Sequence, residues 1–422
     1  MGLLDQVTPH LYAFVKRNKK LRDAVMPVWR FTAESYIKIK SWATGAQVLP
    51  PPQGVIESVK EWTRTSPRKG GKTTTPYKEV YPAQEIKRKL PKTIESQIHW
   101  KFKINETHQQ PATFVVTLEG GRVYDEGTVI TADNYLLAEV SRIISDGVYI
   151  KDASKHPVFA KEALPPLQKV KGKVAVLSAA GGRGYYHWIF DVLPRIQLLR
   201  EAGIDLHTID KFLINNYVSK FHIETLNLLG IPREKVLESH WNPHIQAEHL
   251  IVPSLVGDTG HIPAWACEFL RKEFLSKTPV TTDSPKRLYF NRGLVTHRKV
   301  SNEKEIVDYL DTLGFKSITL ESLPLMEQFS LLAHADVVIV PHGAGLTNIV
   351  FCKPGTKVIE LLSPHAVNVM YWTLSNQIGL DYYYLIATGE RPAEFVNAYR
   401  NNDNLTIDME ELKGILEMAN VY

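Results

Sequence analysis

The segment from Val337 to Pro364 reads "VVIVPHGAGLTNIVFCKPGTKVIELLSP", two short apolar runs separated by a glycine-rich turn and a helical stretch. This order of strand, turn, helix and strand is typical of a parallel α/β sheet. Gly343 and Gly345 let the backbone approach a ligand closely, and a helix from Leu346 directs unpaired N–H groups and its positive dipole end to the same point. The segment therefore predicts a diphosphate-binding turn at the end of a strand.

The same alternation of strand and helix extends outward from this segment in both directions. Downstream of residue 281 we expect strands in "RLYFN", "SITL", "VVIVP" and "KVIELL", with helices at residues 302–313, 324–335 and 346–351. Between residues 167 and 280 we expect strands in "KVAVLSA", "DKFLIN", "EKVLES" and "EHLIVPS", with helices at 185–201, 222–229 and 261–276. The sequence predicts an α/β protein with two Rossmann-like domains facing a central cleft, where the ligand binds.

Composition changes along the chain suggest the domain limits. Residues 1–110 are expected to form an N-terminal helical and β extension with a linker, because proline, glycine and charge accumulate around 50–52 and 66–79. Residues 111–280 are expected to form the N-terminal domain, which begins with antiparallel strands at 112–150. A polar, proline-bounded stretch, "KTPVTTDSP", then leads into the C-terminal domain at 281–422.

The composition restricts the class of protein. With 422 residues, 44% hydrophobic and 23% charged, the chain is globular, and its net charge of +5 favours phosphorylated small molecules without indicating a nucleic-acid-binding protein. Cys267 and Cys352 are too far apart to indicate a zinc cluster or a disulfide framework. No run reaches the ~20 apolar residues that span a bilayer, and the start lacks the order of a signal peptide, so we expect a cytoplasmic protein.

Residues 1–45 contain eight Lys or Arg and three Asp or Glu, with aromatic residues between them. This pattern predicts either a basic amphipathic helix at the inner face of a membrane or an extension packed on the main body. Pro27 interrupts the helical periodicity, which favours the second alternative.

Three further side chains are candidates for binding the same ligand as the glycine turn. Arg292 closes the "RLYFN" strand and Arg298 follows on the loop, so both are expected at the carboxyl edge of the sheet, where open α/β proteins bind ligands. Guanidinium groups match phosphate oxygens in geometry. Glu360, one strand further on, is expected to accept the hydroxyls of a ribose.

A second unusual stretch, "SAAGGRGYYHWIFDVLPRIQLLR", spans residues 178–200. His187, Asp191 and Arg195 recur every four residues and therefore share one helix face. A histidine and an aspartate within one turn can act as a general-base pair, although the same spacing also suits a surface ladder of ion pairs. Pro194 cannot donate a hydrogen bond to the preceding turn, so we expect the helix to bend near Asp191.

Other chemistries fit the sequence less well. The nicotinamide-dinucleotide fingerprint requires a third glycine where Asn348 stands, and the nucleophile elbow of a serine hydrolase is absent. "GGKTT" is not a P-loop, because Ser66 occupies the position of its first glycine. No paired aspartates end an apolar strand, so a metal-held diphosphate is not indicated.

The chain resembles glycosyltransferase family 61, inverting enzymes with a GT-B fold that use sugar nucleotides. The likeness is carried by "GYYHWIFDVLPRIQLL" (184–199), "LYFNRG" with "THRKVSNEKEI" (288–306) and, most specifically, "PHGAGLTNIVFCKPGTKVIEL" (341–361). It covers roughly residues 110–390. One departure is that Asn291 stands where the family often has a serine before the arginine.

The resemblance implies diphosphate contacts from Arg298 and from His342 to Gly345, with the helix of His187 and Asp191 facing them across the cleft. Because the chain lacks a signal anchor, it is more similar to bacterial cytosolic members that assemble polysaccharides. We expect transfer of a sugar from a nucleoside-diphosphate donor, with UDP as the expected nucleotide, to a glycan hydroxyl without metal or cofactor. The alternatives are a non-catalytic nucleotide- or sugar-binding subunit of a polysaccharide-assembly complex and a nicotinamide-dependent oxidoreductase. A homo-oligomer is also among the expected states of the protein.

The expected site residues fall into three sets. The catalytic set is Asp191 and His187. The nucleotide-sugar set is Arg292, Arg298, His342, Gly343, Ala344, Gly345, Leu346, Thr347 and Glu360. The acceptor-side set is Gly184, Tyr186 and Arg195.

Overall fold

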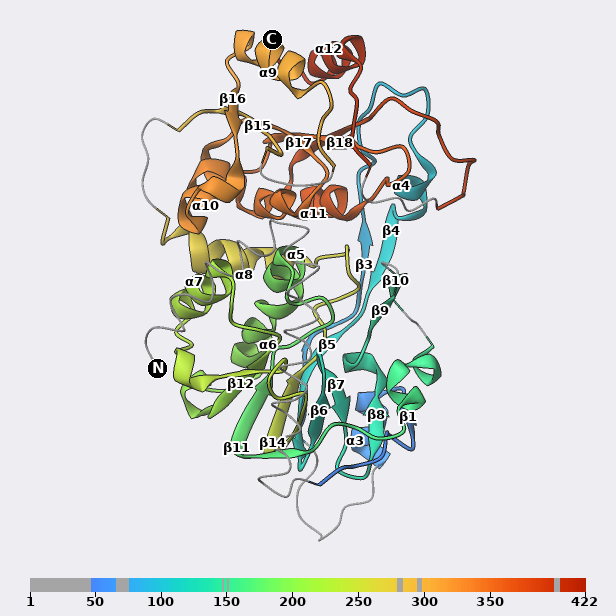
Figure 1. Ribbon diagram of the computed structural model, residues 1–422, viewed down its shortest axis with the longest axis vertical. Helices are drawn as coiled ribbons and strands as arrows, with labels where there is room; N and C mark the ends of the chain where they lie inside the picture. The colour runs from blue at the N-terminus through green and yellow to red at the C-terminus, as the bar shows by residue number, and fades with distance from the viewer. Residues whose placement is uncertain are drawn as a thin grey trace, which may run out of the picture. The chain divides into compact units, whose positions relative to one another are not determined.

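The structure is a computed structural model that describes residues 47–65, 76–145, 148–149, 152–278, 284–293, 298–397 and 403–422. The chain divides into two compact units (Figure 1). Unit 1 comprises Met1–Ala83 and Pro111–Val256, and unit 2 comprises Gln84–Gln110 and Gly257–Tyr422. The basic segment 1–45 and residues 66–75 of the expected linker lie outside the described residues.

These units divide the chain at Val256 rather than at residue 280, and they do not separate residues 1–110 as an extension. Helix α8 (Ala264–Leu275) belongs to unit 2, where Arg271 donates to the carbonyl oxygens of Val350 and Cys352 at 2.7 and 2.6 Å. Residues 84–110 also pack in unit 2, since Phe102 stacks on Tyr384 with ring centroids 4.7 Å apart. Long-range contacts therefore set these limits.

Unit 1 is built on a ten-stranded mixed sheet. Four neighbouring strands of this sheet pair in parallel: β11 (Gln168–Val176), β12 (Lys211–Ile214), β13 (Val236–Glu238) and β14 (His244–Pro253). The remaining strands of the sheet are β1 (Gly54–Ile56), β2 (Tyr77–Tyr81), β5 (Thr113–Glu119), β6 (Arg122–Tyr124), β7 (Thr128–Ile130) and β8 (Tyr135–Leu137). Strands β5 and β6 pair antiparallel with β14, which confirms the antiparallel strands expected at 112–150 and places them in the same sheet as the parallel ones.

Short helices accompany this sheet. Among its described residues, unit 1 contains the helices α3 (Val59–Thr65), α5 (Tyr185–His187), η4 (Trp188–Val192), α6 (Arg195–Glu201) and α7 (Lys220–Leu228). Single turns are η1 (Ala138–Val140), η2 (Ala153–Lys155), η3 (Pro157–Ala160), η5 (Leu206–Thr208) and η6 (Arg233–Lys235), and β9 (Ile144–Ser145) pairs with β10 (Val148–Tyr149). Buried aliphatic side chains of the strands form the core, among them Val174, Leu213 and Leu250.

Unit 2 contains a five-stranded, fully parallel sheet in the order β16-β15-β17-β18-β19. Its strands are β15 (Arg287–Phe290), β16 (Lys316–Ile318), β17 (Val337–Pro341), β18 (Lys357–Leu362) and β19 (Asp381–Ile386). Every residue of β17 is buried, as expected for a parallel strand covered on both faces. The four strands expected in this half of the chain are confirmed, and β19 was not anticipated.

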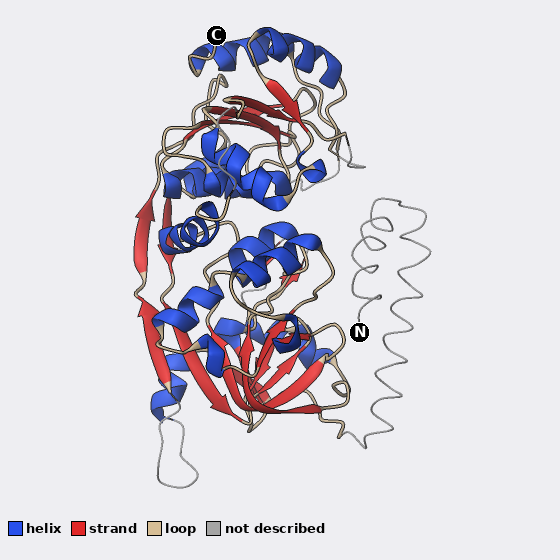
Figure 2. Ribbon diagram, turned by 90° about the vertical axis from the view of Figure 1, so that its left-hand side faces the viewer, coloured by secondary structure: helices blue, strands red, loops and turns tan. Residues whose placement is uncertain are grey.

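Helices cover both faces of this sheet, so unit 2 is Rossmann-like (Figure 2). Helices α9 (Glu303–Thr312) and α12 (Met409–Met418) lie on one face, and α10 (Leu325–His334) and α11 (Met370–Ile378) lie on the other (Figure 1). The remaining elements are η7 (Leu320–Ser322), η8 (Ala344–Phe351), α4 (Trp100–Ile104), and the hairpin of β3 (Gln84–Lys87) with β4 (Thr107–Gln110). Among the described residues, none of these helices has the length and apolar character needed to cross a bilayer.

Candidate functional site

The glycine turn lies at the carboxyl end of β17, as the sequence predicts. The backbone N–H of His342 donates to Leu361 O at 2.9 Å, which continues the pairing with β18 for one residue beyond the strand. The following helix, η8, begins at Ala344, two residues before the expected start at Leu346, and it is a more tightly wound 3₁₀ helix rather than an α-helix. The turn therefore presents closely spaced backbone N–H groups at the sheet edge.

Gly343 leaves room for an arginine. A Cβ atom at this position would lie 2.1 Å from Arg292 Nη1, so any side chain there would displace the guanidinium. The glycine is needed for this close approach and not for an unusual backbone conformation, because its φ of 172° is extended.

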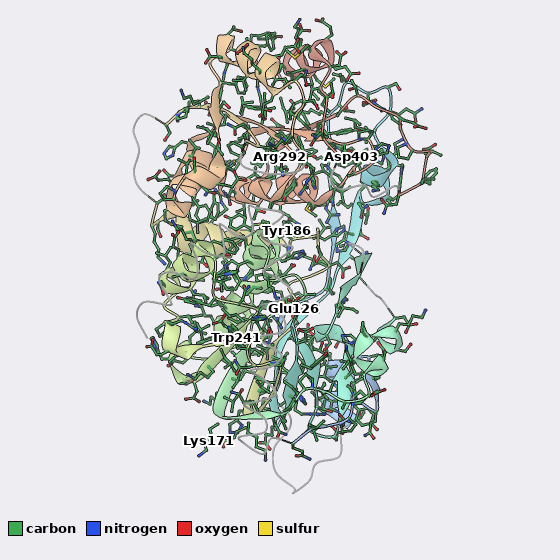
Figure 3. All side chains as sticks on the ribbon, viewed as in Figure 1. Glu126, Lys171, Tyr186, Trp241, Arg292 and Asp403 are labelled. Atoms are coloured by element: carbon green, nitrogen blue, oxygen red, sulfur yellow. The ribbon has the colours of Figure 1, made fainter. Side chains whose placement is uncertain are left out.

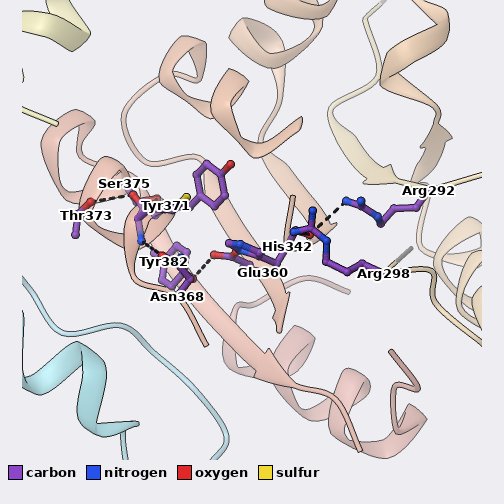
Figure 4. Close-up of polar contacts among 10 residues, drawn as sticks. Arg292, Arg298, His342, Glu360, Asn368, Tyr371, Thr373, Ser375 and Tyr382 are labelled. Atoms are coloured by element: carbon purple, nitrogen blue, oxygen red, sulfur yellow. Dashed lines mark hydrogen bonds and ion pairs between the residues drawn. The ribbon is translucent and has the colours of Figure 1, made fainter. Parts of the chain in front are cut away.

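Two guanidinium groups converge on this turn (Figure 4). Arg292 Nη1 donates to His342 O at 3.2 Å, and Arg298 Nη1 donates to the same oxygen at 3.4 Å. Burial, and then the charge of Arg298, lower the pKa of Arg292 to about 10. Within the described part of the chain, no carboxylate forms an ion pair with Arg292. Two neighbouring cations that share a neutral acceptor favour an anionic ligand.

Arg298 also has an unusual backbone. Its φ is +56°, in the left-handed region that non-glycine residues rarely adopt. Backbone strain of this kind is concentrated at ligand clamps and active sites, where surrounding structure holds it in place. The conformation is consistent with selection for the position of the guanidinium.

Behind the turn lies a buried polar chain. His342 Nδ1 contacts Glu360 Oε1 at 2.5 Å, and Tyr382 donates to the other carboxylate oxygen. Glu360 is fully buried, so in this arrangement it holds His342 rather than presenting a carboxylate to a ribose as the sequence suggested. The desolvated phenol beside this carboxylate has a pKa well above its usual range.

The side chains of the other turn residues differ in their solvent exposure. The side chains of Leu346 and Thr347 point into unit 2 and are fully buried, whereas Ala344 is exposed. A Cβ at Gly345 would lie 3.1 Å from a methyl group of Leu320, which is a tight contact. Ligand contacts from this turn would therefore come mainly from backbone N–H groups.

In unit 1, the expected helix 185–201 is interrupted. It consists of α5, the π-helix η4 and α6, and Leu193 N donates to Trp188 O at 3.0 Å across the wider turn. Pro194 stands at the start of α6, which explains why the ladder cannot continue regularly. An irregularity was expected near Asp191, and it takes the form of this π-turn. π-Turns of this kind are frequent at functional sites.

His187 and Asp191 form a close pair on this π-turn. Their Nδ1 and Oδ2 atoms lie 2.6 Å apart, and their side chains are 24% and 14% exposed. Burial alone would lower the pKa of His187, but the hydrogen bond and charge of Asp191, with the charge of Glu126, raise the pKa above its usual value. Since an ionised carboxylate only accepts, Nδ1 carries a proton and Nε2 of the neutral ring is the acceptor.

The acceptor-side residues do not all belong with this pair. Arg195 is only 1% exposed and donates to Ser178 O at 2.7 Å and Pro253 O at 2.5 Å, so it ties strand ends together inside the unit. Tyr186 is also buried, edge-on against Phe190 and His187. Gly184 caps α5 through its backbone. The ladder of three charges on one exposed face is therefore not observed.

Glu126 is a residue that the sequence patterns did not single out. It forms an ion pair with Arg183 at 2.7 Å and accepts from Gly181 N at 3.2 Å. Glu126 lies in a turn 55 residues before Gly181 in the sequence. Sequence patterns of helices and strands extend over a few residues only, so they could not predict this contact. Tyr382 was missed for the same reason.

The predicted site residues thus fall into two groups. The histidine–aspartate pair belongs to unit 1, and the arginine–glycine turn belongs to unit 2. Figure 3 labels Tyr186, whose ring lies edge-on against His187 of the pair, and Arg292 of the turn. The fold and the turn define a Rossmann-like protein with a basic site at the carboxyl edge of its parallel sheet.

Comparison with known proteins shows what part of the chain is similar to. Residues 185–359 match the family model of glycosyltransferase 61, and this range contains both groups. Over 87 residues the chain is 32% identical to Beta-1,2-xylosyltransferase RCN11 of Oryza sativa subsp. japonica; the match covers 18% of this chain and 16% of that protein. Residues 185–359 are therefore similar to glycosyltransferase 61 proteins, and the chain spans only a small part of the length of the relative that it matches.

Proposed function

We propose that the protein is an inverting glycosyltransferase of the GT-B type that moves a sugar from a UDP-linked donor to a glycan hydroxyl. The observation that carries the proposal is the convergence of Arg292 and Arg298 on the carbonyl oxygen of His342 at a glycine turn. The family match of residues 185–359 supports the same class of reaction. The relative's name makes UDP-xylose the first donor to test.

In this mechanism, unit 2 binds the donor diphosphate. Arg292 and Arg298 replace their shared carbonyl contact with phosphate oxygens, and the N–H groups of residues 343–346 add further donors. Fixed donors of this kind stabilise the charge that develops on the leaving diphosphate, an effect of roughly 3 to 4 kcal/mol per donor in comparable sites. Positive charge is supplied by the protein, so the proposal requires no divalent ion.

His187 is the base in this proposal, and Asp191 orients it. The acceptor hydroxyl gives its proton to His187 Nε2 as its oxygen bonds to the anomeric carbon. The bond between that carbon and the diphosphate oxygen breaks in the same step, and the electron pair leaves with UDP. A single displacement inverts the anomeric centre. Direct proton transfer to Asp191 is the alternative, and Asp191→Asn compared with His187→Ala distinguishes the two.

The wider setting is also part of the proposal. We propose that the acceptor belongs to a cell-surface or capsular polysaccharide and that the protein works in the cytoplasm, with residues 1–45 contacting the inner face of a membrane or a second copy of the chain. A non-catalytic nucleotide- or sugar-binding subunit is the rival function. Binding of UDP or a UDP-sugar without transfer of the sugar to any acceptor across a panel of glycans would favour that rival.

Titration calorimetry with UDP tests the donor site. Removing a charged hydrogen bond costs about 1.5 to 3 kcal/mol, so Arg298→Ala should weaken UDP binding at least about tenfold. Lys413→Ala is the matched control, because it removes an exposed positive charge elsewhere in unit 2. Equal UDP affinity in the wild type and Arg298→Ala would refute the proposed role of Arg298.

A further inference from the structure

A second hollow in unit 2 has a volume of about 190 Å³. It lies among the loops that follow β18 and β19 and beside helix α4, and its lining includes Trp100, Lys101, His365, Arg391 and Glu394. These strands come next after β17 in the sheet order, so the hollow lies at the same carboxyl edge as the glycine turn. We call it the α4 pocket. Its size suits a single ring rather than a drug-sized ligand, for which pockets are typically about 300–1,000 Å³.

The cations of the α4 pocket are already engaged. Lys101 Nζ donates to Val367 O at 2.9 Å and to Asn397 Oδ1 at 2.7 Å. Arg391 forms two hydrogen bonds of 2.7 Å with Glu95. Arg391, the arginine of this described lining, is already paired with a carboxylate, in contrast to Arg292 at the glycine turn. Glu394 adds a negative charge to the lining, which disfavours a phosphate. The pocket therefore favours a neutral ligand.

Hydrogen-bonding groups remain available to such a ligand. His365 Nδ1 contacts Asp403 Oδ2 at 3.1 Å, which fixes the ring and leaves its other nitrogen to exchange a hydrogen bond. The carboxylate of Glu394 is an acceptor for hydroxyl groups. Engaged pairs such as Arg391 with Glu95 are held rigidly and retain further donor and acceptor sites.

Aromatic surface borders the pocket: Trp100 belongs to its lining, and Phe395 lies in the chain between the lining residues Glu394 and Val396. Trp100 and Phe395 lie with ring centroids 5.5 Å apart, and Phe395 is 66% exposed. Phe395 also has a φ of +65°, an unfavourable backbone conformation for a bulky residue. The adjacent Val396 is 52% exposed. Exposed apolar side chains and a strained backbone at Phe395 together favour a ligand with an apolar face.

A sugar ring combines these requirements, since it has a face of C–H groups for an aromatic side chain and hydroxyls for the polar groups around it. We propose that the α4 pocket binds one neutral sugar ring of a substrate. The inference rests on the proposed function, because it names the sugar-binding part of the same transferase. The ring belongs either to the glycan acceptor or to the donor.

Saturation-transfer NMR on the full chain tests the proposal. The probes are neutral manno- and xylo-oligosaccharides without nucleotide, and UDP-xylose compared with UDP. The variants are Trp100→Ala and Phe395→Ala; the second changes an exposed side chain and is not expected to impair folding. Ile104→Ala is the control, because Ile104 is an exposed apolar residue at the end of α4.

If the ring comes from the acceptor, an oligosaccharide binds alone and both variants weaken it at least tenfold while UDP binding is unchanged. If it comes from the donor, UDP-xylose binds more tightly than UDP, and both variants abolish that difference. No sugar binding by the wild type, or sugar binding unaffected by both variants, would overturn the proposal. Failure of UDP to bind the wild type is a separate result that counts against the proposed function and not against the pocket.

Discussion

At the residue scale, the contact between His187 and Asp191 makes a prediction about pH. The raised pKa of His187 means that the neutral, proton-accepting ring is lost as pH falls through a value above about 6.5. Asp191→Asn removes the charge that raises this pKa, so the acidic limb of the rate profile should move to lower pH. The rate should also fall about a hundredfold or more, as expected for loss of general-base orientation. Measurement of kcat/KM against pH checks this, and an unmoved limb would count against the pair.

Gly181 supports the same ring from the other side. Its φ is +74°, and a Cβ there would lie 2.8 Å from His187 Cδ2. We expect Gly181→Ala to reduce activity more than tenfold by displacing the imidazole. Gly203→Ala is the matched control, because Gly203 has a φ of +81° with no atom within 4 Å of the added Cβ. Both variants should lose about 1 kcal/mol of stability from backbone strain; equal activities in the two would contradict the contact with His187.

At the element scale, a short extended segment holds the loop of Arg298. Lys299 N donates to Asn404 Oδ1 at 3.0 Å, and Leu405 N donates to Lys299 O at 2.8 Å. These two hydrogen bonds hold the backbone of Lys299, the residue that follows Arg298 and its strained φ. Asn404→Ala should therefore weaken UDP binding about three- to tenfold, consistent with loss of one hydrogen bond.

A double-mutant cycle distinguishes this positioning role from general destabilisation. In the Arg298→Ala background, Asn404→Ala should have no further effect on UDP affinity, because the group that it positions is already absent. Additive losses of affinity would show that Asn404 acts independently of Arg298. Titration calorimetry of the four proteins provides the measurement.

Elements were predictable where one pattern dominates. Strand β17 is a short apolar run bounded by turn residues, and both its position and its glycine turn follow from the sequence. The π-turn was foreseen only as a bend, because Pro194 shows where a helix fails but not which hydrogen bonds replace it. The burial of Glu360 and Arg195 could not be foreseen, since their partners come from other strands and loops.

At the scale of the whole molecule, the placement of residues 84–110 in unit 2 depends on contacts that no local pattern encodes. Arg88 is a clear example: it is buried and contacts His261 Nδ1 at 3.2 Å across 173 residues of sequence. The ring of His261 stacks on His108 at 3.9 Å. The alternation of strands and helices therefore predicted the fold class, but not the segments that each unit contains.

This same cluster makes unit 2 sensitive to acid. Burial, followed by the charges of His108 and Arg88, lowers the pKa of His261 to about 3, while Asp258 opposes the shift. The unfolded chain then binds more protons than the folded one below about pH 6.5, so stability falls as pH decreases. The thermal midpoint should drop between pH 7 and pH 5, and His261→Gln should reduce that drop. An identical drop in the variant would contradict the assignment.

The central claim is that the arginine pair and the glycine turn bind the donor diphosphate. A crystal structure of the complex with UDP tests it most directly. We expect phosphate oxygens within about 3 Å of the guanidinium groups of Arg292 and Arg298 and of backbone N–H groups after His342. A diphosphate bound elsewhere, with both guanidinium groups still on the His342 carbonyl oxygen, would contradict it.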